Sequence, residues 1–176
     1  MSVAAGLAAE RVEVVSQGSY CVAADRNVVL STLLGSCVAV CLYDPAARLG
    51  GMNHFLLPAG EGAKDHHLRY GVQAMELLIN ALLEAGAARK GLAAKAFGGA
   101  RMTPGLTNIG AGNIRFARYL LASEGIPLVS ESFGGERARR IRFWPATGCV
   151  RMRLVRPSEW PQVRPHFPLF GCFGLF

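Results

Sequence analysis

The sequence predicts an α/β protein in which helices pack on a mixed or antiparallel sheet and form one layered domain. Three observations support this prediction. The run Cys37–Tyr43 is a nearly continuous stretch of strand-forming apolar residues, the segment His66–Ala85 spaces its apolar residues three to four positions apart, and residues 139–155 alternate around a turn. The chain of 176 residues, 51% hydrophobic and 18% charged, is long enough to bury one substantial core.

The N-terminal part indicates a loose terminus followed by strands. Small residues and alanine dominate residues 1–10, as is typical of a loosely held end. Two short strands are expected at residues 11–16 and 20–24. A buried strand follows over Cys37–Tyr43, and Asp44-Pro45 ends it.

A second apolar segment, Leu49–Leu57, is expected to return beside the strand Cys37–Tyr43 and to stop at Pro58. Pairing of these two segments would bring His54 towards Cys37.

Two amphipathic helices are expected in the middle of the chain. The first covers His66–Ala85 and ends near Gly86, and Asn108 caps a second helix that runs to about Ser123. The spacing places the following side chains inward: Val72, Met75, Leu78 and Leu82 in the first helix, and Ile114, Ala117 and Leu121 in the second.

The remaining elements are strands that end at glycine turns. Leu92–Phe97 and Pro127–Phe133 are expected to be strands, followed by Gly98-Gly99 and Gly134-Gly135.

A hairpin is expected over residues 139–144 and 149–155. Its inward side chains would be Ile141, Phe143, Val150, Met152 and Leu154. The opposite face would then carry Arg140, Arg142, Arg151 and Arg153, which we call the arginine face. Like charges on neighbouring strands repel, so this face predicts an acidic partner, although a simply solvated basic face fits the pattern equally well.

The charge distribution agrees with that prediction. Residues 1–100 contain eight Lys/Arg and eight Asp/Glu, whereas residues 101–176 contain eleven arginines and four acidic residues. Nucleic acid is the less favoured acidic partner, because the arginine-rich strands lack interleaved aromatic residues and match no nucleic-acid module. We therefore expect no nucleic-acid binding.

The cysteine pattern and the chain start indicate a reducing compartment. Five cysteines without metal-like spacing are not typical of a disulfide framework or a zinc site. The start has no signal-peptide pattern, and no apolar run is long enough for a membrane helix. We expect a cytoplasmic protein that does not insert into the membrane.

Cys37 and His54 are the candidate catalytic residues. Cys37 directly follows a Gly-Ser turn, and His54 returns on the next apolar segment. A thiol attacks a carbonyl as the thiolate, so it needs an imidazole to take and return its proton. The same residues also occur in ordinary cores, so this pair alone is a moderate signal.

Several ordered segments make the signal specific. Leu34–Asp44, Gly51–Pro58, Lys95–Met102 and Asn108–Ala111 resemble, in this order, segments of the CheD family of chemoreceptor glutamine deamidases. Phe133-Gly134-Gly135 and Thr147-Gly148-Cys149-Val150 are similar to that family's closing segments. The resemblance covers roughly residues 20 to 156. It implies a deamidase domain at 11–160, between the terminus at 1–10 and an apolar tail at 161–176.

The resemblance implies hydrolysis of a glutamine side-chain amide on a receptor, with Cys37 as nucleophile and His54 as acid and base. It also implies a threonine as third catalytic group. Thr32 keeps the residue type, whereas Ser31 lies at the more usual distance before Cys37, so both remain candidates with Thr32 slightly favoured. No cofactor and no metal are implied. One departure is Gly112, where the family commonly has arginine.

Partners follow from the same resemblance. It implies binding to the cytoplasmic helices of chemoreceptors, on which the arginine face could dock, and contact with a CheC-type phosphatase. The alternative function is a non-catalytic adaptor that only binds the receptor or the phosphatase. A pure adaptor would have no use for an intact Cys37–His54 pair.

Overall fold

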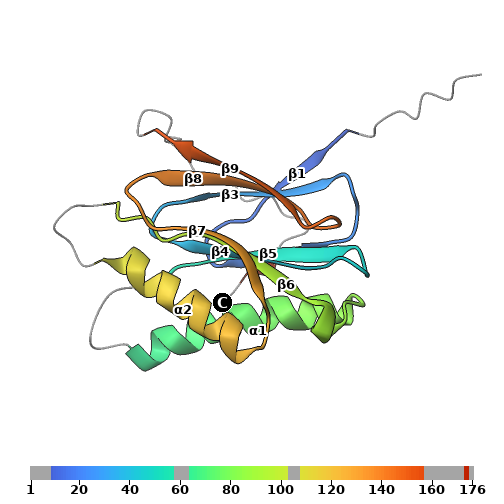
Figure 1. Ribbon diagram of the computed structural model, residues 1–176, viewed down its shortest axis with the longest axis horizontal. Coiled ribbons are helices and arrows are strands. Elements are labelled where there is room, and N and C mark those ends of the chain that lie inside the picture. Colours follow the sequence, from blue (N-terminus) through green and yellow to red (C-terminus); the bar gives the residue numbers. More distant parts are fainter. Residues whose placement is uncertain (1–8, 58–63, 103–107, 157–172, 175–176) are drawn as a thin grey trace, which may run out of the picture.

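The computed structural model describes residues 9–57, 64–102, 108–156 and 173–174. These residues form three layers: a four-stranded sheet, a six-stranded sheet and a layer of helices (Figure 1). The expected layered α/β domain with helices on a mixed sheet is confirmed, although its strands form two sheets and not one. The strands β1–β3 and β6–β7 pair in parallel, and the other strands pair antiparallel.

The two sheets interleave along the chain. The four-stranded sheet has the order β1-β3-β8-β9, with strands Arg11–Val14, Val28–Leu34, Ala138–Trp144 and Cys149–Val155. The six-stranded sheet has the order β10-β2-β5-β4-β6-β7, with strands Phe173–Gly174, Ser19–Ala23, Leu49–Phe55, Val38–Asp44, Ala93–Gly98 and Leu128–Phe133.

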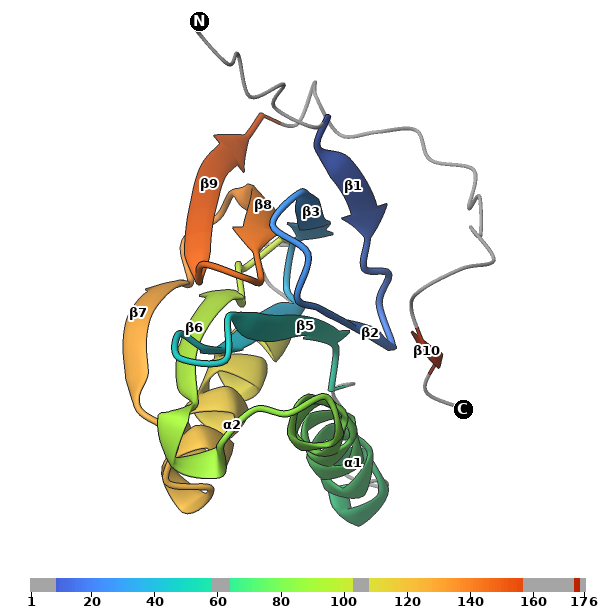
Figure 2. The same cartoon turned by 90° about the vertical axis from the view of Figure 1, so that its right-hand side faces the viewer.

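The helices α1 (Lys64–Glu84) and α2 (Ile109–Ser123) cover the outer face of the six-stranded sheet, as Figure 2 shows from the side. Asn108 caps α2 as expected, because its side chain accepts the Ala111 N–H. A short 3-10 turn, Arg89–Gly91, precedes β6. The expected inward residues Met75, Leu78, Leu82, Ala117 and Leu121 are buried, whereas Ile114 is only half-buried.

One core lies on each side of the six-stranded sheet. The helix-side core includes Val40, Leu42, Leu78 and Phe116. The core between the two sheets includes Leu30, Ala39, Met52 and Phe143. The six-stranded sheet is therefore buried on both faces in its middle, where every residue of β4 and β5 except Tyr43 is buried.

Two expectations about the four-stranded sheet differ from the structure. The sequence analysis predicts no strand over Val28–Leu34, yet this segment is β3, the strand between β1 and β8. Met152 and Leu154 are expected inward but are about 40% exposed. They lie on β9, which is the edge strand of its sheet, so their side of the strand is incompletely covered.

Part of the apolar tail can be placed. Phe173–Gly174 pairs with Ser19 and Tyr20 at the edge of the six-stranded sheet, and most of residues 161–176 lie outside the described residues. No helix among the described segments is long and apolar enough to cross a membrane.

Candidate active site

Cys37 lies in the turn between β3 and β4, immediately before β4 begins. The turn is tied to the end of β6: the Gly99 N–H donates to the Cys37 carbonyl at 2.8 Å, and the Ala100 N–H donates to the Gly35 carbonyl at 2.8 Å. Gly98 has φ +119°, and a Cβ at this position would lie 2.1 Å from the Cys37 carbonyl oxygen. The loop geometry therefore depends on glycine at position 98.

The Cys37 thiol is neutral at rest. Its burial raises the pKa, and the backbone N–H groups of Cys37 and Gly35 oppose this rise only in part. The thiol donates to Oε1 of Gln17 at 3.3 Å. A base is consequently needed before the sulfur can attack a carbonyl.

His54 lies on β5 opposite Ala39 of β4, so the two side chains share one face of the sheet. Cys37 precedes Ala39 by two residues, which places it at the end of that same face. The pairing expected from the sequence is thus present. This face packs towards the four-stranded sheet, and only 5% of His54 is exposed.

The hydrogen bonds of His54 define its tautomer. The Thr32 hydroxyl donates to the Val15 carbonyl at 2.8 Å, so its oxygen is left to accept from His54 Nδ1, 2.9 Å away. Nδ1 also lies 3.3 Å from the Val15 carbonyl, which can only accept. The proton of the neutral ring is therefore on Nδ1, and Nε2 carries a lone pair.

Nε2 is the unprotonated nitrogen of the His54 ring. It is buried and has no hydrogen-bond partner among the described residues. Burial lowers the pKa of His54 to about 4, with partial compensation from the Val15 carbonyl. At neutral pH the ring is uncharged and able to take a proton.

Ser31 and Thr32 lie on opposite faces of β3, because neighbouring residues of a strand alternate. Thr32 points inward with Leu30 and Leu34, towards His54. The Ser31 hydroxyl instead donates to the Ile141 carbonyl at 3.0 Å.

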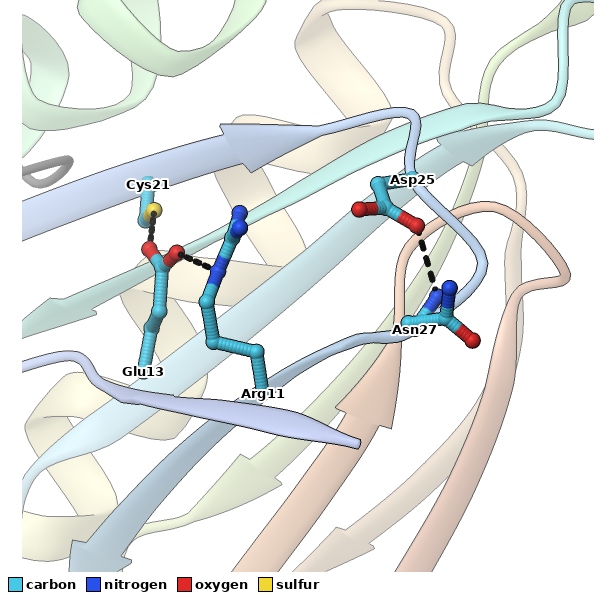
Figure 3. A network of polar contacts seen from close by, with 5 residues as sticks. All are labelled: Arg11, Glu13, Cys21, Asp25 and Asn27. Carbon is cyan, nitrogen blue, oxygen red and sulfur yellow. Dashed lines mark hydrogen bonds and ion pairs between the residues drawn. The ribbon is translucent and has the colours of Figure 1, made fainter. Parts of the chain in front are cut away.

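The loop Val15–Gly18 joins β1 to β2 and is absent from the sequence prediction of the site. Besides the Val15 contacts, its Gly18 N–H donates to the His54 carbonyl at 2.7 Å. The strands on either side are linked as well, since Glu13 accepts from the Cys21 thiol at 3.2 Å and from Arg11 (Figure 3). Nothing in the sequence pattern singles out Gln17, because it belongs to none of the resembling segments.

Asn113 on α2 connects both halves of the site. Its side-chain oxygen accepts the Leu57 N–H at 2.7 Å, just after β5, and its nitrogen donates to the Ser36 carbonyl at 3.2 Å. Asn113 is fully buried. Its place next to the Asn108–Ala111 segment is the signal that could have indicated it.

Arg139 is a buried cation beneath the same loops. It donates to the carbonyls of Gly98 and Gly134 at 3.3 and 2.6 Å and to Ser132 Oγ at 3.2 Å. Burial lowers its pKa. Arg139 lies two and four residues before the buried Ile141 and Phe143 on the same strand. The alternation of strand side chains could therefore have predicted that it points inward.

The arginine face lies on the other side of β8 and β9. Arg140 pairs with Arg153 across the two strands, and Arg142 pairs with Arg151. Arg142 and Arg151 each lie 5.2 Å from the centre of the Trp144 ring. Glu10 accepts from both Arg142 and Trp144, which offsets part of the charge.

The other cysteines have different surroundings. Cys21 and Cys41 are buried, Cys149 is exposed, and all three are free thiols. Burial strongly raises the pKa of Cys41. The described residues contain no metal-ligating cluster of His, Cys, Asp and Glu; the side chains of His66, His67 and His166 and all of Cys172 lie outside the described part.

The chain is similar to proteins of one family. Residues 56–154 match the family model described as CheD chemotactic sensory transduction. A protein of Caulobacter vibrioides is 55% identical over 150 residues, 84% of this chain and 80% of the relative. One from Cereibacter sphaeroides is 55% identical over 161 residues, 91% of this chain and 81% of the relative. Both are named probable chemoreceptor glutamine deamidase CheD.

Solved structures resemble the chain only remotely. The Bacillus licheniformis hypothetical protein YfiH has a TM-score of 0.44 at 17% identity, over 70% of this chain and 60% of that chain. The Neisseria meningitidis protein NMB0706, of family DUF152, has a TM-score of 0.44 at 13% identity, over 72% of this chain and 63% of that chain.

Proposed function

This chain belongs to the CheD family, and from that membership we propose that it is a protein-glutamine deamidase that converts glutamine side chains of chemoreceptors to glutamate. The observation that carries the proposal is the 51–55% identity, over most of the chain, to relatives named as chemoreceptor glutamine deamidases. Two observations support Cys37, His54 and Thr32 as the catalytic residues: Thr32 contacts the buried imidazole of His54, and Cys37 lies two residues before Ala39, the partner of His54 on β4.

We propose that the reaction begins with proton transfer. The Cys37 thiol gives its proton to Nε2 of His54, and the thiolate attacks the carbonyl carbon of the substrate glutamine. The imidazolium then protonates the departing ammonia, and a thioester remains. A water molecule, deprotonated by the neutral imidazole, hydrolyses the thioester and releases glutamate and the free thiol.

The site geometry supports these roles. Because Thr32 and Val15 hold the proton on Nδ1, Nε2 is the nitrogen that can accept a proton from the thiol. In the resting structure the thiol donates to Gln17, so the first step requires the S–H bond of Cys37 to be redirected from Gln17 to His54. We propose Thr32, and not Ser31, as the third catalytic group, since the Ser31 hydroxyl is bonded on the other face of β3.

The test is mass analysis of receptor cytoplasmic fragments incubated with the protein. Wild type should add about 1 Da for each modified glutamine and release ammonia, whereas Cys37→Ala should do neither. Cys149→Ala, which removes an exposed thiol on β9, is the matched control and should behave as wild type. Binding of the fragment without any mass change would favour the adaptor alternative.

We propose that the arginine face docks the enzyme on the receptor, whose helices would present acidic side chains to it. Arg151 and Arg153 are exposed on the edge strand β9 and can meet such a surface. The double variant Arg151→Glu/Arg153→Glu should bind receptor fragments at least tenfold more weakly at low salt, with unchanged alkylation of Cys37. Arg26→Glu/Arg48→Glu changes the charge equally at exposed positions elsewhere. Equal affinities of the two double variants would contradict docking on this face.

A CheC-type phosphatase is a second proposed partner, and the cytoplasm, where thiols stay reduced, is the proposed compartment. Co-purification of the chain with such a phosphatase from the soluble cell fraction would test both proposals together. Recovery of the chain from another fraction would contradict the second.

A further inference from the structure

The loop Val15–Gly18 is fixed against all the candidate catalytic strands. The Val15 N–H donates to the Ser31 carbonyl at 2.9 Å on β3, and the Gly18 N–H donates to the His54 carbonyl on β5. The loop then turns, with the Ser19 N–H and hydroxyl both bonded to the Ser16 carbonyl. Its backbone therefore holds the position of Gln17 between the two sheets.

The side chain of Gln17 reaches the sulfur of Cys37. The thiol donates to Oε1 at 3.3 Å, although Gln17 is an exposed residue. A carboxamide presents an acceptor oxygen and an NH₂ donor on two arms of similar length. A half turn about the last side-chain bond exchanges them without moving the rest of the residue. The same group can therefore accept from a neutral thiol and donate to a thiolate.

Deamidation creates negative charge at this position twice. The first charge is on the sulfur after His54 takes its proton. The second is on the oxygen of the tetrahedral intermediate, which is bonded to the same carbon as the sulfur. A donor that contacts the sulfur is within reach of that oxygen, and preorganised donors of this kind are a major source of rate acceleration.

We propose that Gln17 is a catalytic residue of this enzyme, whose side-chain NH₂ donates to the Cys37 thiolate and to the oxyanion of the tetrahedral intermediate. The proposal rests on the deamidase function proposed above and adds a residue to its site. No bond of Gln17 forms or breaks in this role. The resting contact agrees with it, because the thiol lies 3.3 Å from Oε1, which is the place that the NH₂ group takes after a half turn of the carboxamide.

Two substitutions remove the donor while keeping the length of the side chain. Gln17→Glu keeps the shape and adds a negative charge, and Gln17→Met is neutral. Both should lower kcat for receptor deamidation by roughly 10²-fold or more with KM changed less than threefold, and Glu should be the worse of the two. Gln73→Glu on the exposed face of α1 is the matched control and should behave as wild type. Thermal unfolding of each variant shows whether the fold is intact.

A second measurement does not depend on deamidation. The rate of Cys37 alkylation by iodoacetamide should shift to higher pH in both Gln17 variants, because the thiolate loses a donor. Two titratable residues are bonded to the backbone near this contact: His54, whose carbonyl accepts the Gly18 N–H, and Arg139, which donates to the Gly98 carbonyl. Both are the same in wild type and in the Gln17 variants. An unshifted pH profile of alkylation would overturn the proposal, whether or not the wild type deamidates receptors. Failure of the wild type to deamidate receptors would instead refute the proposed function.

Two further results would also overturn the proposal. Faster alkylation of Gln17→Met at pH 7 would show that Gln17 restrains the thiol instead of activating it. Conversion of Gln17 to glutamate in wild type, but not in Cys37→Ala, would show that Gln17 is a substrate. Peptide mapping of the segment Val12–Arg26 detects that change, with Gln73 in the same sample as internal reference.

Discussion

A single hydroxyl proton decides which nitrogen of His54 can act as a base. The Thr32 proton is donated to the Val15 carbonyl, so the threonine oxygen can only accept from Nδ1. The Val15 carbonyl of the loop Val15–Gly18 thus fixes the imidazole through the side chain of Thr32, which belongs to the four-stranded sheet. Thr32 is a positioning residue in this arrangement, since it acts through His54.

Replacing Thr32 by valine keeps the shape of the side chain and removes the oxygen. We expect kcat for receptor deamidation to fall between about tenfold and a hundredfold with little change in KM, because the ring loses the acceptor that orients it. Thr32→Ser should recover most of the activity, which a purely structural role would not explain. Steady-state kinetics with Ser31→Ala as control checks this, and an inactive Ser31→Ala beside an active Thr32→Val would reverse the assignment.

The burial of His54 makes the stability depend on pH. Its pKa in the folded protein, about 4, lies below the ordinary value of 6.5, so between these values the unfolded chain binds the proton more strongly. The free energy of unfolding should therefore decrease as the pH falls from 6.5 towards 4, by on the order of 3 kcal/mol.

Urea unfolding between pH 7 and pH 4.5 measures this effect. The pKa values of Glu10, Asp44 and Glu131 are lowered by their hydrogen bonds, so protonation of these carboxyl groups also reduces the stability at acid pH, and the comparison with a His54 variant separates the contribution of the imidazole. His54→Gln should flatten the slope. Equal slopes for wild type and His54→Gln would mean that another group is responsible.

At the residue scale, the sequence predicts Cys37 and His54 but not their surroundings. The spacing of the Gly-Ser-Cys turn and the returning strand is a local pattern, so it is visible in the chain. Gln17 and Arg139 enter through loop closure and sheet packing, which bring together residues that no short segment connects. The choice between Ser31 and Thr32 required knowing which face of β3 each side chain occupies, and this follows only from the packing of the two sheets.

At the scale of elements, the turn after β6 supports the turn before β4. Gly98 takes a positive φ where its backbone crosses the Cys37 carbonyl, and Gly99 follows with φ +67°. Two consecutive left-handed residues are costly for any residue except glycine. The strands β4 and β6 are thereby held in register up to Cys37.

Gly98→Ala should destabilise the protein by about 2 kcal/mol or more and abolish most of the activity, because its Cβ would collide with backbone in addition to the strained φ. Gly125→Ala is the control: φ is +67° there, but a Cβ would meet nothing within 4 Å. Chemical denaturation compares the two variants. A Gly125→Ala that loses as much stability as Gly98→Ala would show that strain alone accounts for the loss.

The strand β3 illustrates a limit of prediction at this scale. Val28, Val29 and Leu30 are all fully buried, so the segment lacks the alternation that marks a half-exposed strand. The edge strand β9 shows the opposite error. Met152 and Leu154 alternate as a buried face would, but whether a face is covered depends on the neighbouring sheet.

At the scale of the whole molecule, Arg139 joins the two sheets beside the site. It belongs to β8 of the four-stranded sheet and donates to Gly98 and Ser132 of the six-stranded sheet. These partners are neutral oxygens. The Gly98 carbonyl also accepts the Gly134 N–H at 3.0 Å, so removing the guanidinium would affect the Gly134 carbonyl and the Ser132 hydroxyl most. The α/β fold class was predictable from the sequence of elements, whereas the division into two sheets and this link between them were not.

Arg139→Met should reduce the free energy of unfolding by about 2 kcal/mol and lower kcat, because the part-buried Gly134 carbonyl and Ser132 hydroxyl lose their donor and the two sheets lose this link near the Cys37 turn. Arg137→Met, two residues earlier and exposed, should change stability by less than about 0.5 kcal/mol. Urea unfolding and deamidation assays of both variants test this. A stable, fully active Arg139→Met variant would contradict the proposal that Arg139 links the two sheets beside the site.

The pairing of β3 with β8 has a consequence for biosynthesis. Ser31 is bonded to Ile141, 110 residues later in the chain, and β3 cannot be completed before β8 exists. On the ribosome, Cys37 and His54 emerge well before β8, which completes the sheet that packs against them. A nascent chain that stops before residue 138 would carry the thiol and the imidazole without this pairing, so we expect the site to become ordered only after β8 has been synthesised.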